Sequence, residues 1–236
     1  MPLLFYHIIG KAIPGRTLFK SEQDHLHFLR NVLRFKWYAL FEIHAYCLCG
    51  NHFHLAVRTR SEAHVRAELM QRPLRGLSDT DHAFLDGELD YVTYFKRAFG
   101  PPLAGYAHYA NHGRGLDGQL FVKPTLHGLT DKHGEPGLHF SRRLVAYVAL
   151  NYAKHHLAGA GEKYRWSSLH SRQFDIVDPD VLYGYFGGEE AFRKFVGGYL
   201  KRYGRAFYAF DEDAFFERVT PRHFDKVAGK WLVGEW

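Results

Sequence analysis

The feature of the sequence that most constrains its fold is a pair of apolar segments joined by a very short connection. Residues 41–49 include Phe, Ile, Tyr and Leu side chains, and Gly50 and Asn51 follow almost at once. Residues 52–58 then alternate polar and apolar side chains, which indicates a strand with one buried face. The tight connection between the segments therefore predicts a β-hairpin over residues 41–58.

Further strand and helix patterns lie on both sides of this hairpin. Residues 3–9 have the composition of a strand, which the turn at Pro14 and Gly15 ends. Ser21 is a typical helix N-cap, with Asp24 three residues later, at the start of an amphipathic pattern. The spacing of apolar residues predicts further helices over residues 61–71, 80–99, 138–157, 180–186, 189–203 and 212–218.

The order of these elements determines the predicted fold class. Residues 105–137 are rich in Gly, His and basic side chains, and within them only residues 119–122 have a strand pattern. Strands and a hairpin that alternate with helices predict an α+β fold, namely a ferredoxin-like or RRM-like antiparallel sheet with helices on one face. We expect a core domain over residues 1–170, with an insertion around residues 72–118, and a helical C-terminal extension over residues 171–236.

Composition excludes several classes of protein. The chain has 236 residues, 46% of them hydrophobic and 17% aromatic, which is enough for a packed core and excludes a disordered chain. No apolar run approaches the roughly 18–20 residues that span a bilayer, and no signal-peptide pattern opens the chain. With only two cysteines, we expect a cytoplasmic protein without a disulfide scaffold or a membrane partner. The net charge of +6 and the pI near 9.2 favour nucleic acid as the partner.

A His-x-His pair lies in the second strand of the hairpin. Side chains alternate between the faces of a strand, so His52 and His54 share one face while Phe53 points to the other. Two such imidazoles can hold a divalent cation, although the pattern also arises by chance in a chain with 17 histidines. Cys47 and Cys49 share a face as well, but they lack the partners of a zinc finger, and we interpret them as core packing.

A second pair of interest lies in the helix predicted over residues 138–157. Tyr147 and Asn151 are four residues apart, so their side chains lie one turn apart on the same helix face. A tyrosine in this place can act as a nucleophile beside a metal that the amide binds. In a chain with 15 tyrosines, ordinary packing is the alternative.

Four motifs, in order along the chain, resemble those of one enzyme family. Residues 41–55 are similar to the HAYCLMPNHFHLL motif of the tyrosine HUH single-strand DNA transposases, in particular of their REP-associated branch and its insertion-sequence relatives. Residues 118–121 resemble the GxLF strand of that family, residues 143–151 its YIHxNP helix, and residues 164–169 its YPWSSY element. The resemblance extends over residues 3–169.

This resemblance implies a metal-dependent DNA endonuclease and transposase. His52 and His54 would bind Mg²⁺ or Mn²⁺, with Asn151 as the third ligand. Tyr147 would attack a phosphodiester, form a 5′-phosphotyrosine intermediate and leave a 3′-OH that can later reverse the reaction. The partner would be single-stranded DNA with hairpins formed by palindromic repeats, and residues 1–170 would be the catalytic domain. The sequence has no Gly-rich phosphate loop that ends in Gly-Lys-Ser/Thr, which agrees with strand transfer without ATP.

Three positions depart from the family pattern. Gly50 stands where the family has Pro, a change that a tight turn accepts. Ala149 replaces a frequent His, and Tyr152 replaces the Pro that ends the helix motif. Without that proline the helix can continue, and it can then include His155 and His156.

Basic residues near the expected nucleophile are candidates for contacts with the DNA backbone. Arg142 and Arg143 lie within two turns of Tyr147, where the scissile phosphate must bind. Arg114 and Lys123 are further candidates. The alternative for each of these cations is an ordinary solvated basic surface.

Two other functions stay open from the sequence. One is a replication-initiator or relaxase-type HUH nuclease, which the four ordered motifs and the lack of a helicase domain disfavour. The other is a domesticated protein that binds hairpin DNA without transposition, which the intact His52, His54, Tyr147 and Asn151 disfavour. Tyr147 could serve the histidines of its own chain in a monomer, or those of a partner in a homodimer.

Overall fold

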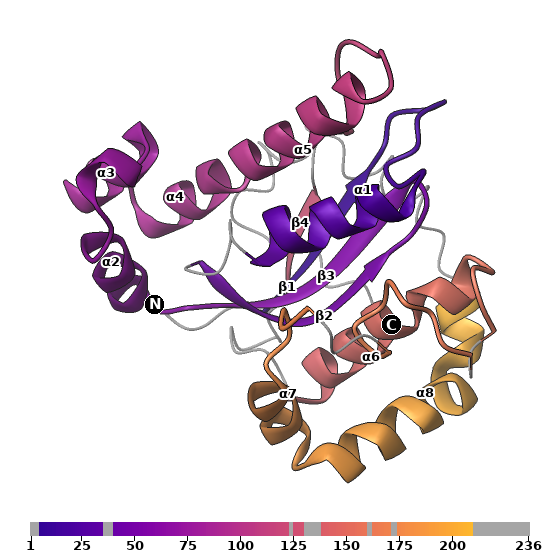
Figure 1. Ribbon diagram of the computed structural model, residues 1–236. Helices are drawn as coiled ribbons and strands as arrows, with labels where there is room; N and C mark the ends of the chain where they lie inside the picture. Colours follow the sequence, from indigo (N-terminus) through magenta and orange to yellow (C-terminus); the bar gives the residue numbers. More distant parts are fainter. Residues whose placement is uncertain are drawn as a thin grey trace.

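The computed structural model describes residues 5–34, 40–122, 125–129, 138–159, 162–170 and 174–209, without the side chains of residues 74, 125–129 and 138–140. At the centre of this described part is an antiparallel sheet built from β1 (Phe5–Lys11), β2 (Phe41–Leu48), β3 (His52–Thr59) and β4 (Thr125–Leu129). The strands are ordered β2–β3–β1–β4 across the sheet. Helices lie on both of its faces (Figure 1).

The helices fall into three groups along the chain. Between β1 and β2, helix α1 (Glu22–His27) continues directly into the π-helix η1 (Phe28–Arg34). The segment between β3 and β4 holds α2 (Glu62–Met70), η2 (Leu74–Gly76), α3 (Asp79–Leu85), α4 (Tyr91–Ala98) and α5 (Gly100–His112). After β4 follow α6 (Leu138–Lys154), α7 (Pro179–Phe186) and α8 (Glu189–Ala209). Among the described residues, no helix combines the length and the apolar character needed to cross a membrane.

The β-hairpin predicted over residues 41–58 is confirmed. Strands β2 and β3 pair antiparallel, with Cys47 opposite His54. The N–H of Cys49 donates to the carbonyl of His52 at 2.8 Å and closes the turn. The hairpin therefore holds the residues of the His-x-His pair and the two cysteines in one fixed register.

One face of the sheet packs against α1, η1, α4 and α5. Ile8, Phe53 and Leu55 point to this face and are fully buried in its apolar core. The predicted helix start is confirmed, because the N–H of Ser21 donates to Oδ2 of Asp24 at 2.9 Å and the N–H of Asp24 donates to Oγ of Ser21 at 3.2 Å. Such a capping box satisfies N–H groups that have no partner within the helix.

The other face of the sheet is covered by α6, together with α7 and α8 (Figure 1). Ala45 on β2 and Ala56 on β3 present small side chains here, and they pack in one cluster with Val145 and Ala146 of α6. The α+β class is confirmed, but the expectation of helices on one face only is wrong. The central strands β1 and β3 are buried along almost their whole length, so helices cover both of their faces.

The helix predicted over residues 80–99 is in fact two helices, α3 and α4. Gly87 has a φ of +82° in the connection, and the side chain of Asp90 accepts backbone N–H groups at the start of α4. Helix α5 then begins at Gly100 with proline in its first turn, where a missing N–H costs no helical hydrogen bond. Residues 105–112, which belong to the stretch rich in Gly, His and basic side chains and lie outside the predicted helices, are therefore helical.

The strand predicted over residues 119–122 is replaced by a single bridge between Ala12 and Phe121. The outer strand β4 lies a few residues later and pairs with β1. The other predicted helices are confirmed as α2, α6, α7 and α8. The helix predicted over residues 212–218 lies outside the described residues.

Candidate active site and metal cluster

Strand β3 brings a pair of histidines to the face of the sheet that α6 covers. His52 is 5% exposed and His54 is fully buried. Their ring centroids lie 4.9 Å apart with nearly perpendicular planes. Phe53, between them, packs in the core on the opposite face, so the two imidazoles share one face as the alternation of the strand predicts.

Each of these imidazoles is held by a neighbour at its Nδ1. Nδ1 of His54 lies 3.0 Å from Nε2 of His7 on β1, and Nδ1 of His52 lies 2.7 Å from Oδ1 of Asn51 in the turn. Histidines that bind metals commonly have such a partner on the second ring nitrogen, because it fixes the orientation of the ring. Both contacts engage Nδ1, so Nε2 is the nitrogen that a metal would meet.

Helix α6 lies across the histidines and carries Tyr147 and Asn151. The ring of Tyr147 meets the ring of His54 edge-on at a centroid distance of 6.1 Å, and that of His7 at 5.7 Å. Asn151, one turn further on, is fully buried, and its Oδ1 lies 3.6 Å from Sγ of Cys49. The packing of α6 on the sheet thus brings together the histidine pair and the helix pair that the sequence singled out.

One contact of Tyr147 was not expected from the sequence. Nζ of Lys154 donates a hydrogen bond to the hydroxyl of Tyr147 at 3.2 Å and lies 5.4 Å from the centre of its ring. Lys154 follows Tyr147 by two helical turns, so the spacing on α6 alone could have indicated this contact. A cation beside a phenol oxygen stabilises the phenolate, which is the nucleophilic form of the side chain.

Three potential metal ligands lie close together in this region, and we call Cys49, His52 and His155 the thiol–histidine cluster. Sγ of Cys49 and ring nitrogens of His52 and His155 all lie within 4.8 Å of one another, and Nε2 of His52 is 3.0 Å from Nε2 of His155. These side chains are close enough to hold a metal ion. Helix α6 continues past Asn151, as the missing proline predicts, but it ends at Lys154 and does not include His155 or His156, and His156 has a φ of +54°. His155 reaches the cluster because it directly follows the end of α6, whereas the sequence pattern did not indicate a ligand role for Cys49.

The segment over residues 164–169 fixes α6 against the edge of the sheet. The N–H of Leu48 on β2 donates to the carbonyl of Trp166 at 3.0 Å. The hydroxyl of the fully buried Ser167 donates to the carbonyl of Ala149 in α6 at 2.6 Å. This segment therefore joins the strand that leads to Cys49 with the helix that carries Tyr147 and Asn151.

Arg142 and Arg143, two of the predicted DNA contacts, hold the C-terminal helices against α6. Nε and Nη2 of Arg142 donate to the carbonyl of Tyr185 at 3.1 and 2.9 Å. The guanidinium of Arg143 lies 4.4 Å from the centre of the Tyr203 ring. Both arginines are half-buried and engaged within the fold, and their expected role at the DNA backbone stays a prediction.

Arg114, a third predicted DNA contact, belongs to a polar network inside the fold. Its Nη2 lies 2.9 Å from Oδ2 of Asp24, and its guanidinium also donates to the carbonyls of Thr17 and Leu18. A guanidinium that is engaged in this way ties α5 to the start of α1, which argues against the expected contact with DNA. Lys123, the fourth candidate, lies outside the described residues.

Helix α8 covers the tyrosine. Tyr147 is 7% exposed, and the ring of Phe207, near the end of α8, meets it edge-on at a centroid distance of 5.4 Å. Phe207 itself is 2% exposed. In this arrangement α8 shields Tyr147 from solvent.

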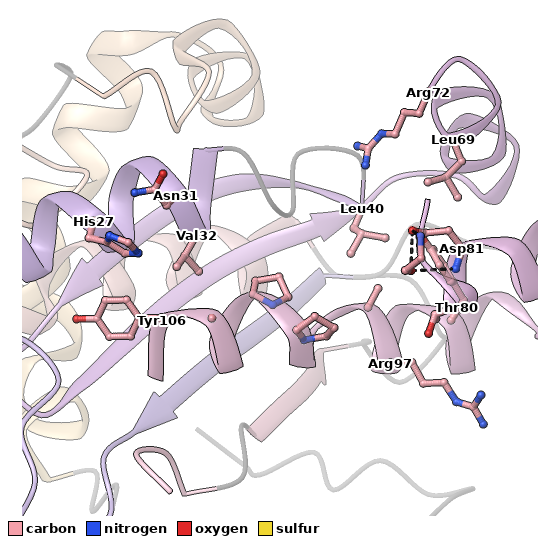
Figure 2. Close-up of a pocket in the computed structure, with 16 residues that line it drawn as sticks. His27, Asn31, Val32, Leu40, Leu69, Arg72, Thr80, Asp81, Arg97 and Tyr106 are labelled. Atoms are coloured by element: carbon pink, nitrogen blue, oxygen red, sulfur yellow. Dashed lines mark hydrogen bonds between the residues drawn. The ribbon is translucent and has the colours of Figure 1, made fainter. Parts of the chain in front are cut away.

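A separate pocket of about 520 Å³ lies on the opposite side of the sheet (Figure 2). Its wall includes His27 of α1 and Tyr106 of α5, as well as Asp81 of α3. Asp81 is already engaged, because it accepts hydrogen bonds from the N–H and the hydroxyl of Ser78 at 2.8 and 2.7 Å. The lining of this pocket includes none of His52, His54 and Tyr147, so the pocket is separate from the site that these residues form.

No family model, no curated protein and no solved structure matches the chain. The contacts of His52, His54, Tyr147 and their neighbours are therefore the basis on which a function can be proposed.

Proposed function

We propose that the protein is a metal-dependent single-stranded DNA endonuclease and transposase that cleaves and rejoins DNA at hairpin-associated sites. One observation carries this proposal: the ring of Tyr147 packs against His54 while Lys154 donates to its hydroxyl at 3.2 Å. One interface between a strand and a helix thus holds a potential nucleophile, a cation that stabilises the reactive form of this nucleophile, and a pair of imidazoles.

In the proposed reaction, Tyr147 forms a covalent bond to DNA. The phenol gives up its proton to water, and the phenolate oxygen attacks the phosphorus of a phosphodiester. The bond from phosphorus to the 3′ oxygen breaks, that oxygen takes up a proton, and the 5′ phosphate remains on Tyr147. Attack by a 3′-OH on this phosphotyrosine releases Tyr147 and restores a phosphodiester, so strands are rejoined without another energy source.

The side chains present fit a divalent cation. His52 and His54 offer imidazole nitrogens, their rings are oriented by Asn51 and His7, and Asn151 offers a buried amide oxygen. The amide oxygen is a ligand that suits Mg²⁺ and Mn²⁺, and water and the phosphate of the substrate would supply further oxygen ligands to either ion. When bound, such a cation polarises the phosphodiester and neutralises the charge that develops on it.

The fold supports the same proposal. The antiparallel order β2–β3–β1–β4, with helices between β1 and β2 and again between β3 and β4, supports the ferredoxin-like core that the resemblance implies. Tyr147 and His54 of one chain are in contact, which supports a monomer that acts on DNA with its own nucleophile.

The test is formation of a covalent adduct. The full chain is incubated with Mn²⁺ and single-stranded DNA that carries the hairpins flanking its own gene, and the products are separated on a denaturing gel. We expect a protein–DNA adduct from the wild type and none from Tyr147→Phe. Tyr152→Phe, on the same helix but outside the ring contacts of His54, is the matched control and keeps the adduct. An adduct that persists in Tyr147→Phe, or that is absent from the wild type, contradicts the proposal.

The shielding of Tyr147 favours a second candidate function, namely binding of hairpin DNA without cleavage. With Tyr147 at 7% exposure beneath Phe207, the protein could recognise DNA through other surfaces and leave the tyrosine unused. In that case the hairpin DNA shifts in a native gel, and neither the wild type nor Phe207→Ala forms an adduct.

A further inference from the structure

The thiol–histidine cluster joins two parts of the chain that lie about one hundred residues apart. Cys49 and His52 flank the turn of the hairpin, and His155 directly follows the last residue of α6. Cys49 is 1% exposed and His52 is 5% exposed, while His155 lies at the edge of the site and is half-buried. A ligand held by all three side chains would therefore be enclosed by protein on the side of the sheet and open on the side of His155.

The distances within the cluster are close to those of a tetrahedral metal site. Bond lengths of about 2.3 Å for Zn–S and about 2.0 Å for Zn–N place two ligand atoms about 3.3–3.6 Å apart. Nε2 of His52 and Nε2 of His155 are 3.0 Å apart, and the three ligand atoms all lie within 4.8 Å of one another. Small side-chain rotations are enough to bring these atoms to the distances of a bound ion.

The side-chain amide of Asn151 is a fourth potential ligand beside the thiol–histidine cluster. Oδ1 of Asn151 lies 3.6 Å from Sγ of Cys49, which is the separation of a sulfur and an oxygen that share one tetrahedral ion. Asn151 is fully buried, so its amide is held in place by the packing of α6. The fourth position of a metal at the cluster is therefore supplied by this amide or by water.

The orientation of His52 is fixed before any ion binds. Its Nδ1 is engaged by Oδ1 of Asn51 at 2.7 Å, which directs Nε2 towards His155. The N–H of Cys49 donates to the carbonyl of His52 at 2.8 Å, and this backbone hydrogen bond sets the separation of the two ligands across the turn. A preorganised set of ligands lowers the cost of ordering side chains on binding.

From these contacts we infer that Cys49, His52 and His155 form a binding site for a thiophilic divalent cation of the Zn²⁺ type. A thiolate and two imidazoles are the ligands that Zn²⁺ and Co²⁺ prefer, whereas Mg²⁺ and Mn²⁺ favour oxygen. The thiol of Cys49 loses its proton to solvent when the ion binds, so binding releases one proton and involves no change of oxidation state. The site differs in ligands and in preferred metal from the one proposed for DNA cleavage, with which it shares only His52 and the amide of Asn151.

The experiment uses Co²⁺ as a spectroscopic probe on the full chain in the absence of DNA. Coordination of Co²⁺ by a thiolate gives a charge-transfer band in the near ultraviolet, and tetrahedral Co²⁺ also absorbs in the visible range. Added Zn²⁺ should displace the Co²⁺ and remove these bands. We expect the charge-transfer band in the wild type and its loss in Cys49→Ser. Cys47→Ser is the matched control and should keep the band. Cys47 is also buried, and its Sγ lies 3.8 Å from Sγ of Cys49.

A second pair of variants tests the histidine of the helix. His155→Ala should weaken Co²⁺ binding by at least about tenfold, by analogy with the effect of removing even an indirect metal partner. His156→Ala, the exposed next residue, should leave the affinity unchanged. Circular dichroism of each variant shows whether it is folded.

The inference is overturned if the Co²⁺ band does not depend on Cys49. A folded Cys49→Ser protein with the same band as the wild type, or a band lost in Cys47→Ser instead, removes Cys49 from the site. His54→Gln and Tyr147→Phe should both keep the band. Since the measurement needs neither DNA nor an intact nucleophile, its failure leaves the proposed cleavage untouched, and failure of the adduct assay leaves this metal site untouched.

Discussion

Lys154 and Tyr147 are joined by a hydrogen bond of 3.2 Å between Nζ and the phenol oxygen, two turns apart on α6. Lys154 is the last residue of that helix, so its cation also lies near the negative end of the helix dipole. The pair places a positive charge at the oxygen that the proposed reaction requires to become negative. A cation fixed in this position before the reaction lowers the cost of forming the nucleophile.

Replacement of Lys154 by Met should therefore slow adduct formation. Loss of one fixed electrostatic partner costs roughly 10²–10³-fold in rate at comparable sites. Lys154→Arg keeps the charge and should restore part of the rate, whereas Lys163→Met, which removes an exposed lysine beyond α6, should have no effect. The measurement is the initial rate of adduct formation with Mn²⁺. Equal rates for Lys154→Met and the wild type would remove Lys154 from the mechanism.

The contact between Phe207 and Tyr147 predicts that the end of α8 limits access to the nucleophile. Phe207→Ala removes the ring that lies 5.4 Å from Tyr147 and should raise the rate of adduct formation. Phe192→Ala is the matched control, because Phe192 is a buried residue of the same helix that packs on Phe186 instead. Both substitutions delete a buried ring and cost up to about 3–5 kcal/mol of stability. A difference between the two variants in the rate of adduct formation therefore reports the specific contact of Phe207 with Tyr147. A lower rate in Phe207→Ala would show that α8 supports the active conformation.

The ion pair between Arg114 and Asp24 should contribute to stability rather than to DNA affinity. Both side chains are about nine-tenths buried, and removal of one partner from a buried pair costs about 3–5 kcal/mol. Arg114→Met should therefore lower the free energy of unfolding measured in urea by that amount. Arg75→Met, which removes an exposed arginine, is the control for the loss of positive charge. A folded Arg114→Met protein of normal stability but much weaker binding to hairpin DNA would restore the role that the sequence suggested.

Asp24 predicts a specific dependence of stability on pH. Burial alone would raise the pKa of Asp24, but hydrogen bonds from the backbone of Ser21 and Lys20, together with Arg114, outweigh burial and hold this pKa below its ordinary value. A carboxyl with a depressed pKa in the folded state stabilises the protein above the pKa of the unfolded chain, about 3.9. That contribution is lost as the pH falls from about 4 through the lower folded-state pKa. Unfolding in urea at a series of acidic pH values should show this loss in the wild type and a flatter profile in Asp24→Asn.

Features set by neighbouring residues could be predicted from the sequence. The hairpin follows from the alternation of residues 52–58 and the short turn, and the capping box follows from Ser21 and Asp24. The break between α3 and α4 has local signals too, since Gly87 permits a positive φ and Asp90 is a helix cap. The apolar spacing over residues 80–99 is continuous across this break, however, and it predicted one helix instead of two. In these cases the physical cause lies within a few residues of its effect.

Features that depend on distant contacts could not be predicted. Arg114 meets Asp24 across 90 residues, and nothing near either residue indicates the other. On the second covered face of the sheet, Ala45 and Ala56 lie opposite each other on paired strands, and their small side chains pack in one cluster with residues of the distant helix α6. The same holds for His155, which is brought to His52 by the packing of a helix across a strand.

The shared use of His52 predicts that Zn²⁺ inhibits the proposed DNA cleavage. An ion at the thiol–histidine cluster occupies Nε2 of His52, and the same imidazole is then not available to the Mn²⁺ that supports adduct formation. Increasing Zn²⁺ at constant Mn²⁺ should therefore suppress the adduct of the wild type, and His155→Ala should need at least about tenfold more Zn²⁺ for the same inhibition, following the expected loss of affinity. His156→Ala should respond as the wild type does. Inhibition at the same Zn²⁺ concentration in His155→Ala and the wild type would mean that Zn²⁺ acts elsewhere, for instance by direct replacement of Mn²⁺ between His52 and His54.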